Sequence, residues 1–140
     1  MKTLKSTLAA IIILFTSVAA TSAAVKPDQP SQNDVVNMYV NAVSNGKAAD
    51  MEKYLDDELQ FNVHQGSNVT TLNKSQVINY LKESTGSNAP VNTNVTVMQQ
   101  DDASAKIKVD FKYDGYTRTD VVTLSKVFGW KITTVESTSK

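Results

Sequence analysis

The sequence of 140 residues contains no cysteine and a single histidine, His64. The lack of cysteine excludes disulfide bonds, thiolate metal sites, thiol nucleophiles and lipid-modified cysteine anchors. One histidine excludes a metal site built from several histidines and argues against a Ser-His-Asp triad within the chain. From the sequence we therefore assign no metal ligand, no cofactor and no catalytic residue.

Neither sign of charge is in excess, since 14 Lys and Arg residues balance 14 Asp and Glu residues. This balance gives no basic patch, and we expect no nucleic-acid partner. Glycine and proline are few, at five and three residues, and 41% of the chain is hydrophobic. Such a composition is that of an ordinary globular protein and excludes disordered and collagen-like chains.

The first 24 residues have the three parts of an export signal. Lys2 and Lys5 precede an apolar run from Leu8 to Val18, and Ser22-Ala23-Ala24 offers small residues for cleavage. The run is shorter than the roughly 20 residues of a membrane-spanning helix. We predict a signal peptide over residues 1–24 and export to a bacterial periplasm or the exterior. An uncleaved membrane anchor is the alternative, and after cleavage we expect no membrane association.

Two prolines among polar residues predict a flexible leader over residues 25–33, which leaves residues 34–140 as one domain. Ser31 and Asp34 have the spacing of a capping box, and Asn45-Gly46 ends the helix that follows it. The next expected elements are a short helix over 48–55, a strand over 59–64 and a helix from Asn73 to near Gly86.

After Val91 the hydrophobic residues recur at every second position, which predicts four antiparallel strands. Asp114-Gly115 is a strong hairpin signal between two of them, and Phe128-Gly129 marks a later turn. A sheet with one apolar face needs helices to cover it, so the sequence predicts an α+β fold.

Two stretches, residues 36–57 and 119–132, resemble the opening and the closing hairpin of the nuclear transport factor 2-like superfamily. The second contains a Thr-Asp strand and a Gly-Trp-Lys-Ile turn, which is most similar to the branch called putative lumazine-binding. The resemblance covers residues 34–136. It implies a cystatin-like cone fold, in which a curved antiparallel sheet wraps around a long N-terminal helix. The branch name implies a small heteroaromatic ligand, but a fold alone assigns no function.

The superfamily also includes isomerases. Two positions of this sequence show whether it carries the isomerases' catalytic residues. The resemblance places the isomerases' tyrosine donor at Tyr39, and their general-base aspartate at Val63, which cannot accept a proton. Tyr39 is either a donor in a ligand site or a core tyrosine. Phe61 and Val63 share one face of the predicted strand, and His64 falls on the opposite face. We therefore expect His64 to be exposed or to lie at a rim.

Arg118 and Asp120 lie two residues apart, on the strand face that also carries Val122 and Leu124. A charged pair leading into an apolar cavity can orient a polar ligand. The alternative is an internal ion pair that fixes the closing hairpin. We favour this structural role narrowly and retain both residues as candidates for ligand binding.

Aromatic side chains supply the remaining candidates for ligand binding, with a purely structural role in the core as the alternative. These candidates are Phe61, Tyr80, Phe111 and Trp130. The acidic run Asp56-Asp57-Glu58 is not assigned to a cation, because three consecutive carboxylates do not face one point.

The leading hypothesis is an exported, non-catalytic domain that binds a small apolar or heteroaromatic molecule in a conical cavity. A second hypothesis is a structural or interaction module with a filled cavity. It would form a homodimer through the uncharged outer strip of Thr117, Thr119, Val121 and Thr123. The third is an enzyme of the isomerase or cyclase type, which lacks a base at Val63.

Overall fold

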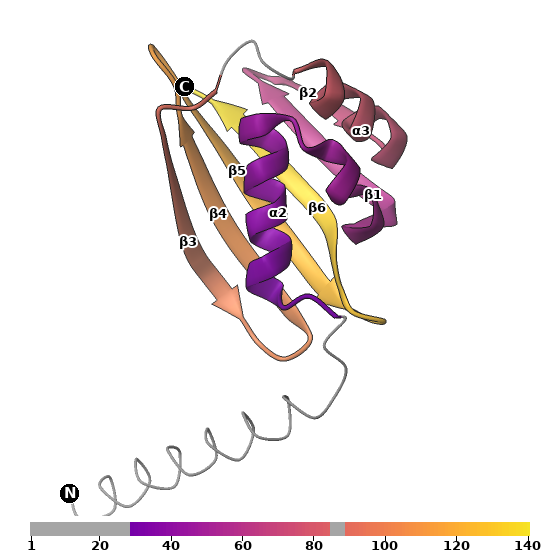
Figure 1. Cartoon of the computed structure of the whole chain (residues 1–140). Helices are drawn as coiled ribbons and strands as arrows, with labels where there is room; N and C mark the ends of the chain where they lie inside the picture. Colours follow the sequence, from indigo (N-terminus) through magenta and orange to yellow (C-terminus); the bar gives the residue numbers. More distant parts are fainter. Residues whose placement is uncertain (1–28, 85–88) are drawn as a thin grey trace, which may run out of the picture.

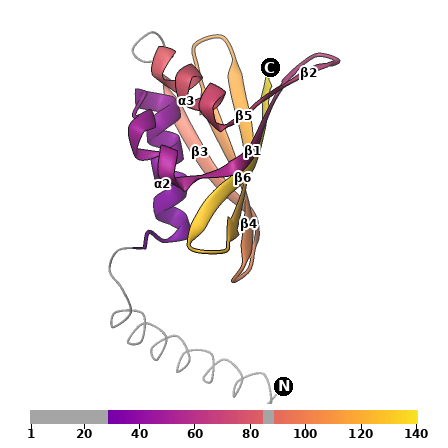
Figure 2. The same ribbon diagram turned by 90° about the vertical axis from the view of Figure 1, so that its right-hand side faces the viewer.

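The computed structural model describes residues 29–84 and 89–140, which form a layer of helices on one face of a six-stranded sheet (Figures 1 and 2). The α+β class and the curved sheet around an N-terminal helix are thereby confirmed. The predicted signal peptide, residues 1–24, and Gly86, the expected end of the third helix, lie outside the described residues.

The long helix α2 (Gln32–Asn45) begins and ends where its capping residues require. The Ser31 side chain accepts from the Asp34 backbone amide, and the Asp34 carboxylate accepts from the Ser31 amide, which completes the predicted capping box. Gly46 ends the helix with a φ of 68°, a left-handed conformation that glycine adopts without strain. The helix thus begins inside the segment that the sequence predicted as a leader.

The second predicted helix is replaced by two short 3-10 turns, η1 (Ala48–Asp50) and η2 (Glu52–Tyr54). The chain leaves the helical conformation at Leu55, because this residue already pairs with Ile132 in the sheet. The third helix is confirmed as α3 (Lys74–Glu83), with Asn73 and Gln76 forming its capping box.

The strands lie in the order β2-β1-β6-β5-β4-β3, and their pairs are antiparallel except for β1 and β6, which are parallel. Their bounds are Leu55–Gln65 for β1, Asn68–Leu72 for β2, Asn92–Gln100 for β3, Ser104–Lys112 for β4, Thr117–Lys126 for β5 and Trp130–Ser139 for β6. The parallel pair joins the two ends of the domain and was not predicted.

Two further differences concern β1 and β2. The strand β1 starts at Leu55, so the acidic residues 56–58 lie within it rather than before it. The short β2 was not predicted, because four of its five residues are exposed and only Leu72 is partly buried. It pairs with β1 across a turn at Gly66, where φ is 61°.

Three irregularities in register bend the sheet around α2. They lie between Leu55 and Gln60 in β1, between Val97 and Gln99 in β3, and between Thr123 and Leu124 where β5 meets β6. Bulges of this kind bend a strand and increase its local twist. The concave face then holds the core, to which α2 contributes Val35, Val36, Tyr39 and Ala42.

Candidate functional site

Arg118 and Asp120 form a buried ion pair on the concave face of β5. Strict alternation along this strand turns both side chains inward, and their exposed fractions are 8% and 0%. Arg118 Nε donates to Asp120 Oδ1 at 2.9 Å, and Nη2 donates to Oδ2 at 2.7 Å. This bidentate geometry is the strongest arrangement of a guanidinium and a carboxylate.

Tyr39 of α2 completes the cluster from the helical layer. Its hydroxyl donates to Asp120 Oδ2 at 2.5 Å. Burial, and then the negative charge of Asp120, raises the pKa of Tyr39 well above its usual value. Tyr39 therefore acts as a neutral donor, and Asp120 accepts three hydrogen bonds in a region without water contact.

Aromatic rings surround the guanidinium of Arg118. Its central carbon lies 5.8 Å from the ring centres of Phe61 and Phe111, and 6.0 Å from that of Tyr80. Burial alone would lower the pKa of Arg118, but the carboxylate of Asp120 offsets this, so the pKa lies above its ordinary value. The guanidinium is permanently charged, and the carboxylate neutralises it.

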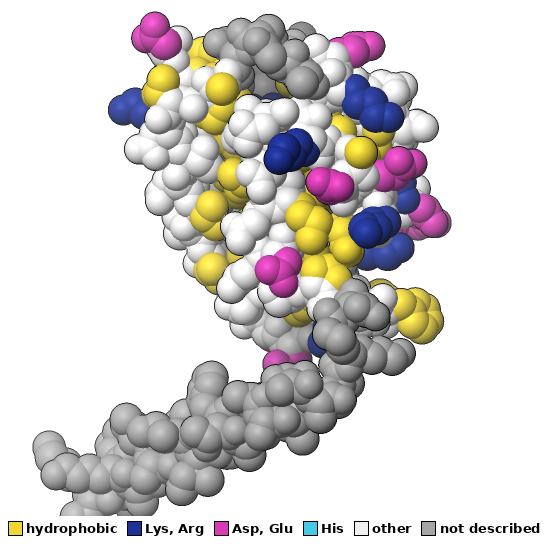
Figure 3. All heavy atoms as spheres, viewed as in Figure 1, with side chains coloured by type: hydrophobic (Ala, Val, Ile, Leu, Met, Phe, Trp, Pro, Cys, Tyr) yellow, Lys and Arg dark blue, Asp and Glu magenta, His cyan; other side chains and the backbone are white. Residues whose placement is uncertain are grey.

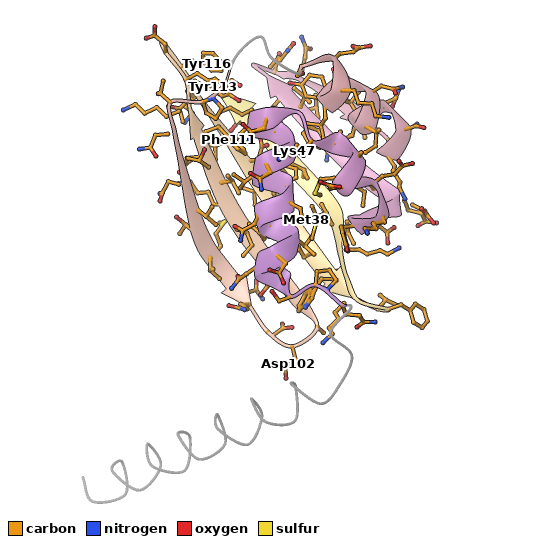
Figure 4. All side chains as sticks on the ribbon, viewed as in Figure 1. Met38, Lys47, Asp102, Phe111, Tyr113 and Tyr116 are labelled. Carbon is orange, nitrogen blue, oxygen red and sulfur yellow. The ribbon has the colours of Figure 1, made fainter. Side chains whose placement is uncertain are left out.

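Beyond Arg118 lies a recess of about 180 Å³ between the end of α3 and the β4–β5 turn. Its aromatic walls are Tyr80, 41% exposed, and Tyr116, 40% exposed, with Tyr113 behind the latter. The rings of Tyr113 and Tyr116 stack at 4.7 Å with an interplanar angle of 10°. Figure 4 shows both tyrosines at the same end of the molecule, above Phe111.

The tight β4–β5 turn brings the two stacked tyrosines together. Tyr113 donates its backbone amide to the carbonyl of Tyr116 at 2.9 Å, and Gly115 between them has a φ of 91°. The predicted Asp114-Gly115 hairpin is thereby confirmed. Residues on either side of such a turn face each other across the hairpin, so the Tyr-Asp-Gly-Tyr pattern was a signal for this pair that the sequence analysis did not use.

The structure brings six of the seven candidate residues into one neighbourhood. Arg118, Asp120 and Tyr39 form the cluster, Phe61 and Phe111 pack beneath the guanidinium, and Tyr80 lies at the rim. Trp130 does not join them. It lies at the opposite end of the sheet, partly buried against the core, with Lys126 Nζ 5.9 Å from its ring centre.

His64 lies on the convex face of the sheet, opposite the cluster, as its alternation predicted. Its Nε2 donates to Glu136 Oε2 at 2.6 Å, and Asn62 donates to the other carboxylate oxygen at 2.8 Å. Val63 lies on the concave side, partly buried against the core. An aliphatic side chain therefore occupies the position that the resemblance aligned with the isomerases' base.

Three further observations concern metal binding, membrane spanning and surface charge among the described residues. Within 29–84 and 89–140, no three His, Cys, Asp or Glu side chains are placed to bind one metal ion. None of the helices in these ranges has the length and apolar character needed to cross a bilayer. On the face seen in Figure 3, acidic and basic side chains are interspersed rather than gathered by sign.

Comparisons with known proteins agree with this fold. A model of the family described as "Putative lumazine-binding" matches residues 28–135. An NTF-2 like protein of unknown function from Silicibacter pomeroyi superimposes with a TM-score of 0.62 at 15% identity, covering 91% of this chain and 98% of that one. An NTF2-like protein described as of unknown function in nutrient uptake, from Rhodospirillum rubrum, gives 0.60 at 16% identity, over 78% and 98%.

A third structure, an NTF2-like protein of unknown function from Shewanella baltica, gives a TM-score of 0.60 at 12% identity, over 76% of this chain and 88% of that one. Among curated protein sequences, none matches the chain. Identities this low show a shared fold, and the match to the family model adds the branch.

Proposed function

The chain belongs to the family described as putative lumazine-binding, and we propose that it binds a small planar heteroaromatic molecule in the recess beyond Arg118. The family and the fold support a small-molecule-binding domain. The proposal adds the place, the residues and the chemical class. In it, Arg118 forms the floor of the site, and Tyr80 and Tyr116 form its aromatic walls.

The observation that carries this proposal is the orientation of the guanidinium. Asp120 occupies the edge formed by Nε and one side of Nη2. Nη1 donates to the hydroxyl of Tyr80 at 3.4 Å, and both Arg118 and Tyr80 line the recess. That long contact is weak, so two N–H groups stay available for a ligand with two neighbouring acceptor atoms.

Charge and size narrow the ligand class. Asp120 neutralises Arg118, so the site offers directed donors without a net positive charge. This favours a neutral or weakly acidic ligand over a phosphate or a nucleotide. The volume of about 180 Å³ lies below the roughly 300–1,000 Å³ of drug-sized pockets. A compound of one or two rings fits this limit, and a steroid exceeds it.

The proposal is for binding rather than for catalysis. The Tyr39 hydroxyl is committed to Asp120, and the three donors to Asp120 leave this carboxylate little capacity to accept a substrate proton. A proton transfer needs a base within reach of the ligand, and Val63 cannot act as one. Export belongs to the same proposal and rests on the sequence of residues 1–24. Mass spectrometry of the secreted chain, with cleavage after Ala24, tests it.

Thermal shift with lumazine, a pterin, riboflavin and a steroid tests the binding. At about a hundred times its Kd, a ligand adds about 2.7 kcal/mol to the unfolding free energy, or roughly 10 °C to the Tm. We expect this rise with lumazine or the pterin. Tyr80→Ala and Tyr116→Ala should each weaken binding about tenfold through lost ring contact. Phe128→Ala is the matched control, because Phe128 is 90% exposed at the other end.

Two results would reject the recess as a ligand site. One is an unchanged Tm with every compound in the set. The other is a rise in Tm that both tyrosine variants leave intact.

A homodimer is the second candidate function, favoured by the convex face of β5. Thr117, Thr119, Val121 and Thr123 line this face, uncharged and partly buried. A row of uncharged side chains on a sheet face is typical of a surface that pairs with another protein. Light scattering across micromolar concentrations tests it, and a constant monomer mass would exclude it.

A further inference from the structure

A second hollow, the Trp130 groove, lies at the end of the domain opposite the recess. It has a volume of about 360 Å³ and is bordered by the start of α2, the β3–β4 turn and the β5–β6 turn. The side chains that matter there are Gln32, Gln100, Asp101, Asp102, Lys126 and Trp130. Figure 4 shows Asp102 at one end of the sheet and the recess tyrosines at the other, so the two hollows are separate.

Gln32 gives the Trp130 groove an unsatisfied hydrogen-bonding group. Its side chain is only 6% exposed, and its Oε1 accepts from Gln100 Nε2. Its other amide atom, Nε2, is buried and has no hydrogen-bond partner among the described residues. A buried polar atom without a partner is costly, and Gln32 borders the groove, so a ligand there can supply the missing partner.

The charges around the Trp130 groove argue against a charged ligand. Asp101 and Asp102 border the groove together with Lys126, so side chains of both signs line it. Asp101 is also committed to its own turn, since its Oδ1 accepts the amides of Ala103 and Ser104 at 2.8 Å each. The neutral groups that border the groove are side-chain amides and the indole of Trp130.

From these observations we infer that the Trp130 groove binds a neutral saccharide of one or two rings. A sugar hydroxyl both donates and accepts, so it satisfies the Gln32 amide whichever of its two atoms faces the groove. The C–H face of a sugar ring can take the place of the Lys126 ammonium, which lies 5.9 Å from the ring centre of the half-buried Trp130 indole. The volume of about 360 Å³ lies within the range of small-molecule sites.

Trp130 is the only tryptophan of the chain, so its fluorescence reports on this groove alone. We would titrate the full chain with maltose, cellobiose and N,N′-diacetylchitobiose, and we expect at least one to change the emission in a saturable way. Gln32→Ala should weaken that binding about tenfold, the equivalent of one net hydrogen bond. Tyr116→Ala, in the recess, should leave it unchanged.

A charge-reversal variant keeps the test decisive if Gln32→Ala lowers stability. Asp102→Lys alters an exposed residue, and it should leave a neutral ligand's affinity nearly unchanged. A charged ligand would instead respond about fivefold or more. Emission that stays constant with every sugar up to its solubility would overturn the inference. So would a saturable response to inorganic phosphate or spermidine without one to sugars. Lumazine binding is measured separately, so either site can fail alone.

Discussion

Two pairs of ionisable side chains lie on opposite faces of the same sheet, with similar contact distances but different surroundings. Arg118–Asp120 on the concave face and His64–Glu136 on the convex face have N···O distances of 2.7 and 2.6 Å. The side chains of the first pair are 10% and 0% exposed, and those of the second are 35% and 43% exposed. The contact distance therefore says little about how much each pair contributes to stability.

Burial decides that contribution. Removing one partner of a buried pair leaves an uncompensated charge away from water, which costs several kcal/mol. An exposed pair is already solvated, and its partners lose little when they separate. We therefore expect the concave pair to hold the fold and the convex pair to adjust it only slightly.

The largest expected effect is that of Asp120→Asn. This variant keeps the size of the side chain but leaves the Arg118 charge buried without its partner, at a cost of about 3–5 kcal/mol. For a domain of this length, each kcal/mol lowers the Tm by roughly 4 °C or more. Thermal unfolding without ligand measures the loss. An unchanged melting curve would show that Asp120 serves a ligand rather than the architecture.

Tyr39→Phe should follow in size. It removes the hydroxyl that donates to Asp120 Oδ2 but leaves both bonds from Arg118 in place. A hydrogen bond to a charged group contributes about 1.5–3 kcal/mol, and we expect a loss within that range by urea denaturation. Tyr80→Phe removes a hydroxyl at 3.4 Å from Arg118 and serves as the control, with almost no change. Equal losses in the two variants would contradict the ranking.

Glu136→Gln should lower the unfolding free energy by no more than about 1 kcal/mol. A double-mutant cycle with His64→Ala measures the coupling between the two side chains directly. A coupling energy between His64 and Glu136 as large as the stability loss in Asp120→Asn would contradict the expected difference between the two pairs.

The smallest expected effect is the pH dependence of the convex pair. The hydrogen bond from His64 lowers the pKa of Glu136 from its usual 4.5. A carboxyl group with a lowered pKa in the folded state stabilises above its unfolded pKa, and loses this as the pH falls through the folded value. The stability difference between the wild type and Glu136→Gln should therefore shrink between about pH 5 and pH 3. A difference that grows on acidification would contradict it.

Alternation in the sequence predicted correctly which side chains of β5 lie on the concave face. For β6 it predicted the core-facing side chains only in part. Arg118 and Asp120 were placed by uninterrupted alternation, which the structure retains. In β6, Ile132 and Val135 both face the core although they are three residues apart. The register shift where β5 meets β6 inserts an extra residue there, and neither hydrophobicity nor turn chemistry marks it.

The recess was harder to predict than the buried cluster, because its parts come from segments that alternation does not connect. Tyr80 was a candidate as an aromatic residue, yet only the placement of α3 beside the sheet brings it to Arg118. The parallel pairing of β1 with β6 crosses most of the domain and leaves no local pattern. Trp130 was grouped with the other aromatics by residue type, and the fold places it at the far end.

A lumazine titration followed by NMR tests the central claim most directly, since it locates a ligand as well as detecting it. We predict saturable shifts of the Tyr80, Tyr113 and Tyr116 ring signals and of the Arg118 guanidinium, with the Trp130 indole signal unchanged. Saturable shifts confined to residues outside the recess, or no saturable shift at all, would contradict it.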